Sequence, residues 1–176
     1  MLNSVPGEVL STRMCQNDRS GIRAKVRSLP DVVLFLQIVV FAAIVPYLLR
    51  LKISRVAAVL EWGGHRRTLP PKQGQVDKIA AYVELAIGRG RPIVRPGCLT
   101  RGLTRYYFFR RSGLDIALCF GMGRIEQEFM GHCWLVKDRE PFLELEDPRP
   151  RYVEVYRISR AGEQLNGNGN RRFSKA

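Results

Sequence analysis

The spacing of apolar residues changes near Gly113, and this change constrains the fold more than any other feature of the sequence. From Val76 to Ile87 apolar residues recur every three or four positions, which is the spacing of an amphipathic helix. After Gly113 they alternate with polar residues, most clearly in YVEVYRIS, as in strands that bury one face. Helices followed by such strands predict an α+β fold, with helices packed on a mostly antiparallel sheet.

Two helices are expected between Val76 and Gly113. The first covers residues 76–88 and ends at the glycines that follow. The second begins at Cys98, directly after Pro96 and Gly97, and covers CLTRGLTRYYFFRR. We expect its aromatic side chains to face the core and its arginines to face solvent, which explains their mixture without nucleic-acid binding.

The segment after Gly113 is expected to form four strands, DIALCFGMG, MGHCWLVKD, FLELE and YVEVYRIS. The glycines of FGMGR lack a Walker lysine, so we interpret them as a tight turn that ends the first strand rather than as a phosphate-binding loop. Cys119 and Cys133 lie inside strands and are expected to be buried as small apolar side chains.

A charge-free apolar run extends from Val32 to Leu49, and basic residues beginning with Arg50 follow it at once. Its length lies at the lower edge for a membrane span, and Gln37 and Pro46 argue against one. We favour a helix that packs on the catalytic domain or on a partner protein. An anchor at a membrane surface is the alternative.

Composition divides the chain into five parts. The 176 residues are enough for one compact catalytic domain with a smaller appendage. Glycine and proline mark a linker before this domain, and a tail rich in Gly, Asn and charge after it is expected to be disordered. The expected parts are a flexible lead-in at 1–28, a hydrophobic helical region at 29–62, the linker at 63–75, the catalytic domain at 76–160 and the basic tail at 161–176.

The net charge of +13 predicts attraction to an anionic partner, such as an acidic peptide or a lipid headgroup surface. The four cysteines form no CxxC pair, and the polar N-terminus shows no cleavable secretory signal, so a reducing cytoplasm is the expected setting. Cys15 is interpreted as an exposed, incidental thiol. With two histidines and no Cys or His pair at ligand spacing, we expect neither a zinc site nor another cofactor.

The order Cys98, His132 and an acidic cluster from Glu144 to Asp147 supplies a cysteine nucleophile, a base and an orienting acid. A helix start favours the thiolate of Cys98, and the backbone N–H there could donate to an oxyanion. His132 lies in an apolar strand and could be a core histidine, but Cys98 upstream favours a catalytic base. His65, in the linker, is expected to be exposed to solvent.

The identity of the acid depends on the turn KDREP. A three-residue turn, Asp138 to Glu140, would place Glu146 opposite His132, with Glu144 on the same face. A turn of two or four residues would place Asp147 there instead. Register therefore leaves three candidate acids.

The stretch PGCLTRGLTRYYFFRRSGLDIALCFGMGR, followed by GHCWLVKDREPFLELEDP, resembles the transglutaminase-like leader peptidases of lasso peptide biosynthesis. These peptidases are related to the C-terminal domain of the microcin-processing protein. The shared features are Cys-Leu-x-Arg from Cys98 to Arg101, the arginine-rich helix end before Gly113, the strand ending at Gly121, and His132 two residues before Trp134.

The resemblance covers about residues 76–147 and implies a transglutaminase-like or papain-like core, with a catalytic helix on a small antiparallel sheet after a hydrophobic helical region. It also implies cysteine-dependent removal of the leader from a ribosomally made precursor peptide, without a cofactor. The implied partners are a small leader-recognition protein and an asparagine-synthetase-like cyclase. The nucleophile maps to Cys98, the base to His132 and the acid to Glu144, where the family usually has aspartate.

Two other functions fit the same residues. An amine could capture the thioester in place of water, which would make the protein an acyl-transferring enzyme. The apolar run and the charge of +13 would also suit a noncatalytic membrane-apposed adaptor.

Overall fold

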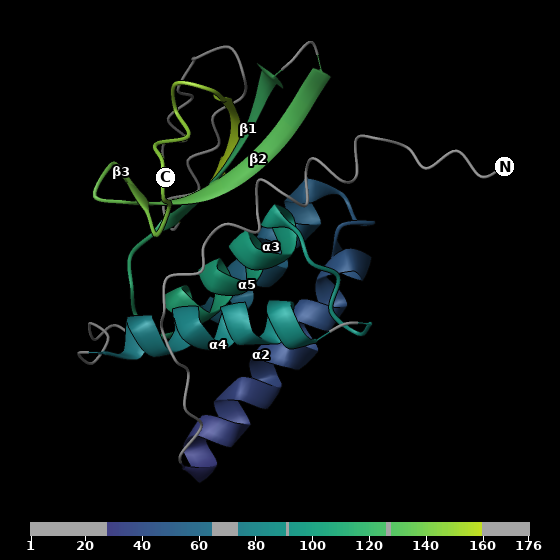
Figure 1. Ribbon diagram of the computed structural model, residues 1–176, viewed down its shortest axis with the longest axis vertical. Coiled ribbons are helices and arrows are strands. Elements are labelled where there is room, and N and C mark those ends of the chain that lie inside the picture. The colour runs from purple at the N-terminus through teal and green to yellow at the C-terminus, as the bar shows by residue number, and fades with distance from the viewer. Residues whose placement is uncertain (1–27, 65–73, 91, 126–127, 160–176) are drawn as a thin grey trace, which may run out of the picture.

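The computed structural model describes residues 28–64, 74–90, 92–125 and 128–159 (Figure 1). The lead-in, most of the linker and the tail, with Cys15 and His65, lie outside these residues. The described helices are α2 (Leu29–Leu48), α3 (Ile53–Gly64), α4 (Gln75–Arg89) and α5 (Cys98–Arg111), and the strands are β1 (Ala117–Ile125), β2 (Glu128–Lys137), β3 (Glu140–Phe142) and β4 (Val153–Ile158). The α+β fold is confirmed, with the helices gathered on one side of the sheet (Figure 1).

One core joins the helices to the near face of the sheet. The apolar residues of α4 and α5 supply the largest share of it, because their spacing turns one side of each helix inward. Cys133 and Leu118 extend this core into the sheet, and Cys119 is buried on the far face, so the expected burial of both cysteines is confirmed. Fully buried side chains of the main core include Ile38, Leu60, Ile79, Tyr82, Val83, Leu103, Tyr106, Phe109, Leu118 and Leu135.

The arginines of α5 are not solvated as expected. The side chains of Arg105 and Arg110 are 5% and 8% exposed. The helix contacts α2, α3, α4 and the sheet, so little of its surface faces solvent. Carboxylates on neighbouring segments take the place of water, since Glu84 pairs with Arg105 and Asp115 pairs with Arg110.

The sheet has the order β3-β2-β1-β4, and its neighbouring strands are antiparallel. In the β1–β2 ladder Gly121 lies opposite His132 and Phe120 lies opposite Cys133. FGMGR is therefore not a turn, because β1 continues through it to Ile125. A Cβ atom at Gly121 would lie 2.6 Å from the Trp134 ring, so this glycine makes room for an aromatic side chain inside the sheet.

The turn between β2 and β3 is the two-residue turn among the lengths that the sequence left open. Lys137 pairs with Glu140, which leaves two turn residues, Asp138 and Arg139, with φ values of 52° and 72°. Positive φ at both positions is the geometry of a type I′ hairpin turn. The expectation that a two-residue turn brings Asp147 opposite His132 was wrong, because this register, if continued, would pair residue 132 with residue 145. The strand β3 in any case ends at Phe142, and the rest of FLELE forms no strand.

The helix α2 packs on α4 and α5 through one of its faces, as the favoured interpretation predicted. Phe41 stacks on Tyr107 with ring centroids 4.3 Å apart, and Asp31 pairs with Lys78 at 2.8 Å. By length and composition, α2 is also the one described helix that could cross a membrane, which is weak evidence because core helices pass the same test.

Candidate active site

The thiol of Cys98 lies at the start of α5, where the expected helix begins. Gly97 before it is extended, and the N–H of Arg101 donates to the Gly97 carbonyl oxygen at 3.0 Å, closing the first turn. The Cys133 thiol donates to the Cys98 carbonyl oxygen at 3.0 Å, which ties the helix start to β2. Cys98 also lies near enough to His132 to raise the pKa of the imidazole.

The imidazole of His132 lies between the thiol and a carboxylate. Its Nε2 atom is 3.4 Å from Glu144 Oε2, and both side chains are 22% exposed. The ring stacks beside Trp134 with centroids 6.1 Å apart and lies 5.2 Å from the ring of Tyr152. This aromatic wall restricts the orientations of the imidazole, so it faces its two polar partners.

The hydrogen bonds at His132 favour its charged form. Burial opposes the positive charge, but the hydrogen bonds to Cys98 and Glu144 and the negative charge of Glu144 outweigh it and raise the pKa of His132 to about 9. A thiolate beside an imidazolium is the reactive form of a nucleophilic cysteine.

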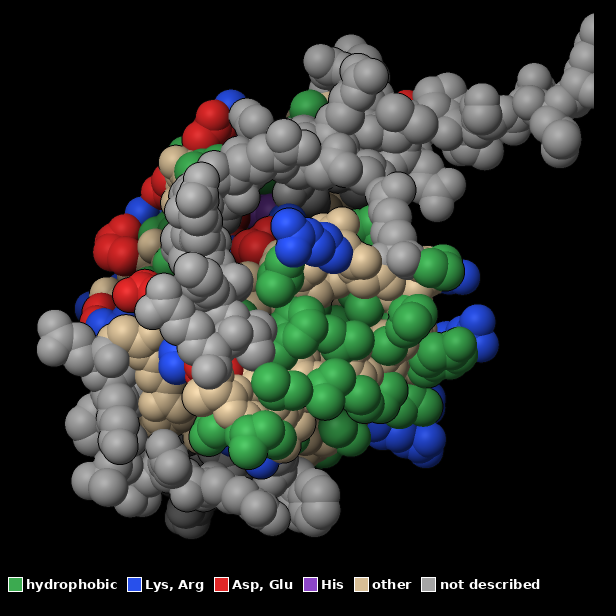
Figure 2. Space-filling model, turned by 60° about the horizontal axis from the view of Figure 1, so that its bottom comes forward, with side chains coloured by type: hydrophobic (Ala, Val, Ile, Leu, Met, Phe, Trp, Pro, Cys, Tyr) green, Lys and Arg blue, Asp and Glu red, His purple; other side chains and the backbone are tan. Residues whose placement is uncertain are grey.

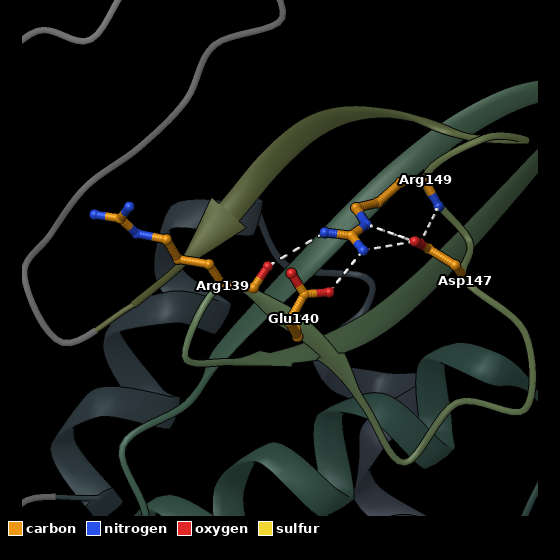
Figure 3. Close-up of polar contacts among 4 residues, drawn as sticks. All are labelled: Arg139, Glu140, Asp147 and Arg149. Carbon is orange, nitrogen blue, oxygen red and sulfur yellow. Dashed lines mark hydrogen bonds and ion pairs between the residues drawn. The ribbon is translucent and has the colours of Figure 1, made fainter.

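Glu144 is the candidate acid that faces His132. Glu146 pairs instead with Arg151 at 3.0 Å, and its side chain is 72% exposed. Asp147 is engaged by Arg149, whose hydrogen bonds lower the pKa of that carboxyl group (Figure 3). The geometry therefore brings Cys98, His132 and Glu144 together and leaves the other two acids in ion pairs.

The loop that carries Glu144 is held at both ends. Leu143, with φ of 60°, turns the chain away from β3 just before Glu144. Beyond it, the Arg149 guanidinium bridges Asp147 and Glu140, with an Nη2–Oε2 distance of 2.7 Å to Glu140 (Figure 3). Because β3 pairs only with residues 135–137 of β2, the edge of β2 near His132 is left to this loop and to the start of α5.

A partly buried ion cluster between α4 and α5 was missed from the sequence. Arg101 binds Glu84 with two nitrogens, at 2.8 and 3.1 Å, and Arg105 adds a third bond at 3.0 Å. Arg105 also donates to the Leu143 carbonyl oxygen at 3.4 Å, so the cluster joins α4, α5 and the residue before Glu144. The sequence feature that could have predicted this cluster is the four-residue spacing of Arg101 and Arg105, which places both side chains on one side of α5.

Gly102 was also missed, although it lies one turn after Cys98. A Cβ atom there would lie 2.7 Å from Cys133 Sγ and 3.3 Å from Leu118 Cδ1, closer than side chains normally approach. The glycine thus lets α5 pack closely on the strand that carries His132.

We expect Gly102→Ala to destabilise the protein by about 1–3 kcal/mol, as overpacking of a tight contact does. Alanine favours the helix itself, so a lower melting temperature would report the helix–sheet contact. The matched control is Gly88→Ala on α4, where a Cβ atom meets nothing within 4 Å. A raised melting temperature in both variants would contradict the expectation.

In the described parts of the chain, no group of three or more His, Cys, Asp or Glu side chains is arranged to hold a metal ion. The arrangement at Cys98 consists of a thiol, an imidazole and a carboxylate. Such a set can carry out nucleophilic and acid–base chemistry with its own side chains.

This fold, with a thiol at a helix start beside a strand histidine, is of the class that includes cysteine peptidases and acyltransferases. The family model of the transglutaminase-like superfamily matches residues 38–157, and the chain belongs to this superfamily. Proteins with this fold are usually enzymes. The match begins near the middle of α2, so it includes only the C-terminal half of the apolar helix. Comparisons with curated proteins and with solved structures find no match.

Replacing Glu144 tests its part in the site. We expect Glu144→Gln to keep the fold and to lower any Cys98-dependent activity by about 10- to 100-fold, since the amide can still accept a hydrogen bond but carries no charge to support the imidazolium. Glu146→Gln, at the neighbouring acid that pairs with Arg151, should leave that activity unaltered. Equal losses in the two variants would exclude a special role for Glu144.

Proposed function

We propose that the protein is a cysteine peptidase that removes the leader from a ribosomally made lasso peptide precursor. The observation that carries the proposal is the His132 imidazole held between Cys98 and Glu144 in a member of the transglutaminase-like superfamily. The substrate class rests on the resemblance of residues 76–147 to leader peptidases of this kind.

The chemistry begins with the Cys98 thiolate, which attacks the scissile carbonyl carbon of the precursor. The first N–H groups of a helix have no partner within the helix, so the start of α5 is suited to stabilise the oxyanion that forms. As Nε2 of His132 faces Glu144, Nδ1 is the nitrogen that exchanges a proton with the reacting groups.

Collapse of the tetrahedral intermediate breaks the C–N bond. The His132 imidazolium gives its proton to the leaving amine, which becomes the new N-terminus of the core peptide, while the leader stays on Cys98 as a thioester. His132 then takes a proton from water, whose oxygen attacks the thioester and releases the leader with a free carboxylate. Glu144 keeps the imidazole in position in both half-reactions.

The partners follow from the same proposal. A small leader-recognition protein delivers the precursor, and an asparagine-synthetase-like cyclase uses the freed amine to close the macrolactam. The high positive charge of the chain would help it to associate with acidic partners or precursors.

The test is incubation of the protein with a cognate precursor and its recognition protein, followed by mass spectrometry. We expect a leader with a free C-terminal carboxylate, and no release by Cys98→Ala. Equal release by that variant would overturn the proposal. A leader joined to an amine would instead assign acyl transfer.

A further inference from the structure

The exposed face of α2 carries a continuous apolar stripe. The stripe follows the helix at intervals of three or four residues, so it forms one line along about 30 Å of helix. Single apolar residues are common on protein surfaces, but a contiguous patch of this kind marks an interaction site. Its residues are Leu29, Val33, Leu36, Val40, Ile44 and Tyr47, which are 45% to 82% exposed.

The opposite face of α2 belongs to the core of the domain. Ile38, Ala42 and Val45 are 0% exposed. The one acidic residue of the helix, Asp31, is buried and pairs with Lys78 of α4. A transmembrane arrangement would have to remove these contacts, whereas a helix lying in the plane of a membrane surface keeps them all.

Charge at the end of the stripe indicates the kind of surface that it meets. The exposed side chains of Arg50, Lys52 and Arg55 follow α2, and the Arg50 guanidinium lies 5.5 Å from the ring centroid of Tyr47. Figure 2 shows the apolar patch with lysine and arginine side chains along one edge. An apolar strip with a basic border is complementary to a bilayer that has anionic headgroups.

The shape of this face also favours a bilayer. In Figure 1, the N-terminal end of α2, in purple, extends below the other described helices. Leu, Val and Ile make up most of the exposed face, and Gln37 is the polar side chain among them. The aliphatic side chains of such a face can insert a short way into a bilayer, whereas the face has few polar groups for directional hydrogen bonds to a protein partner.

We propose that the protein docks on anionic membrane surfaces through this face of α2, with the helix axis parallel to the membrane. The basic residues after the helix contact the headgroups while the rest of the domain stays in water. Docking would keep the peptidase at the membrane without occupying Cys98, which lies on another helix.

The test is co-sedimentation of the full chain with vesicles, one set of phosphatidylcholine alone and one with about a third phosphatidylglycerol. We expect binding to the anionic vesicles that weakens as salt is added. The double variant Val33→Glu with Val40→Glu should bind at least about tenfold more weakly. The control is Val153→Glu on β4, which is 71% exposed and should bind as the unaltered protein does.

A second variant guards against misfolding of the first. The double variant Arg50→Glu with Lys52→Glu leaves the apolar face intact. It should reduce binding to the vesicles that contain phosphatidylglycerol, and it should not change binding to the phosphatidylcholine vesicles. No binding by the unaltered protein, or equal binding by the Val33 and Val40 double variant, would overturn the proposal. Self-association lost in that double variant, without vesicle binding, would assign the face to a second copy of the chain. Binding by Cys98→Ala should be unchanged, so this test is independent of the proposed peptidase activity.

Discussion

Replacing His132 with alanine is expected to reduce leader release by about 10²- to 10⁴-fold, which is the usual contribution of a positioned acid–base group. His132 is the side chain that contacts both Cys98 and Glu144, so its removal takes away the base and separates the other two groups. The fold should survive, because the ring is partly exposed and lies against Trp134 and Tyr152 rather than inside the main core.

Alkylation of Cys98 reports this loss without any substrate. In the unaltered protein the imidazolium persists up to about pH 9, so the rate of reaction with iodoacetamide should change little between about pH 6 and 8. In His132→Ala the rate should rise about tenfold per pH unit, as for an ordinary thiol. Cys119 and Cys133 are buried and supply internal controls. The same steep profile in both proteins would show that His132 does not activate Cys98.

The raised pKa of His132 also predicts a pH dependence of stability. A group whose pKa is higher in the folded state binds its proton more tightly there, so its contribution is complete below about pH 6.5 and is lost as the pH rises through about 9. The free energy of unfolding of the unaltered protein should therefore fall, relative to that of His132→Ala, between about pH 6.5 and 9. Urea titrations at several pH values measure this difference.

The features that the sequence predicts correctly are those set by the local geometry of a single helix or strand. The start of α5 at Cys98 follows from apolar spacing and from the preceding Pro96 and Gly97. The alternation of β2 correctly places His132 and Trp134 on one face and Cys133 on the other, because successive strand residues point to opposite sides. These features depend on residues close to one another in the chain.

The position of the acid depends on features with a weak sequence signal. The two-residue turn at Asp138 and Arg139 contains no glycine, although its positive φ angles favour one. Leu143, which follows β3 and directly precedes Glu144, also has a positive φ without being glycine. The family resemblance selected Glu144, whereas strand register alone placed Glu146 or Asp147 opposite the histidine.

The burial of Arg101 and Arg105 depends on Glu84, which lies on another helix, α4. Replacing Glu84 is expected to have the largest effect on stability. Glu84 neutralises Arg101 and Arg105, whose side chains are 18% and 5% exposed. Glu84→Gln would remove the carboxylate charge that the two guanidinium groups share. Removing one member of a partly buried ion pair is costly, so we expect a loss of about 2–4 kcal/mol, which lowers the melting temperature by roughly 5–10 °C.

An exposed ion pair provides the matched control for this substitution. Glu140 binds Arg149 at 2.7 Å, but its side chain is 69% exposed, so Glu140→Gln should change stability by less than about 1 kcal/mol. Arg105 also contacts the Leu143 carbonyl oxygen next to Glu144, so Glu84→Gln should loosen the acid as well as the helix pair. We expect its Cys98 alkylation profile to steepen toward that of His132→Ala. Glu140→Gln keeps the Arg149–Asp147 pair that holds the Glu144 loop, so it should change the profile much less. Equal melting temperatures in the two variants would mean that the buried cluster contributes no more than a surface ion pair.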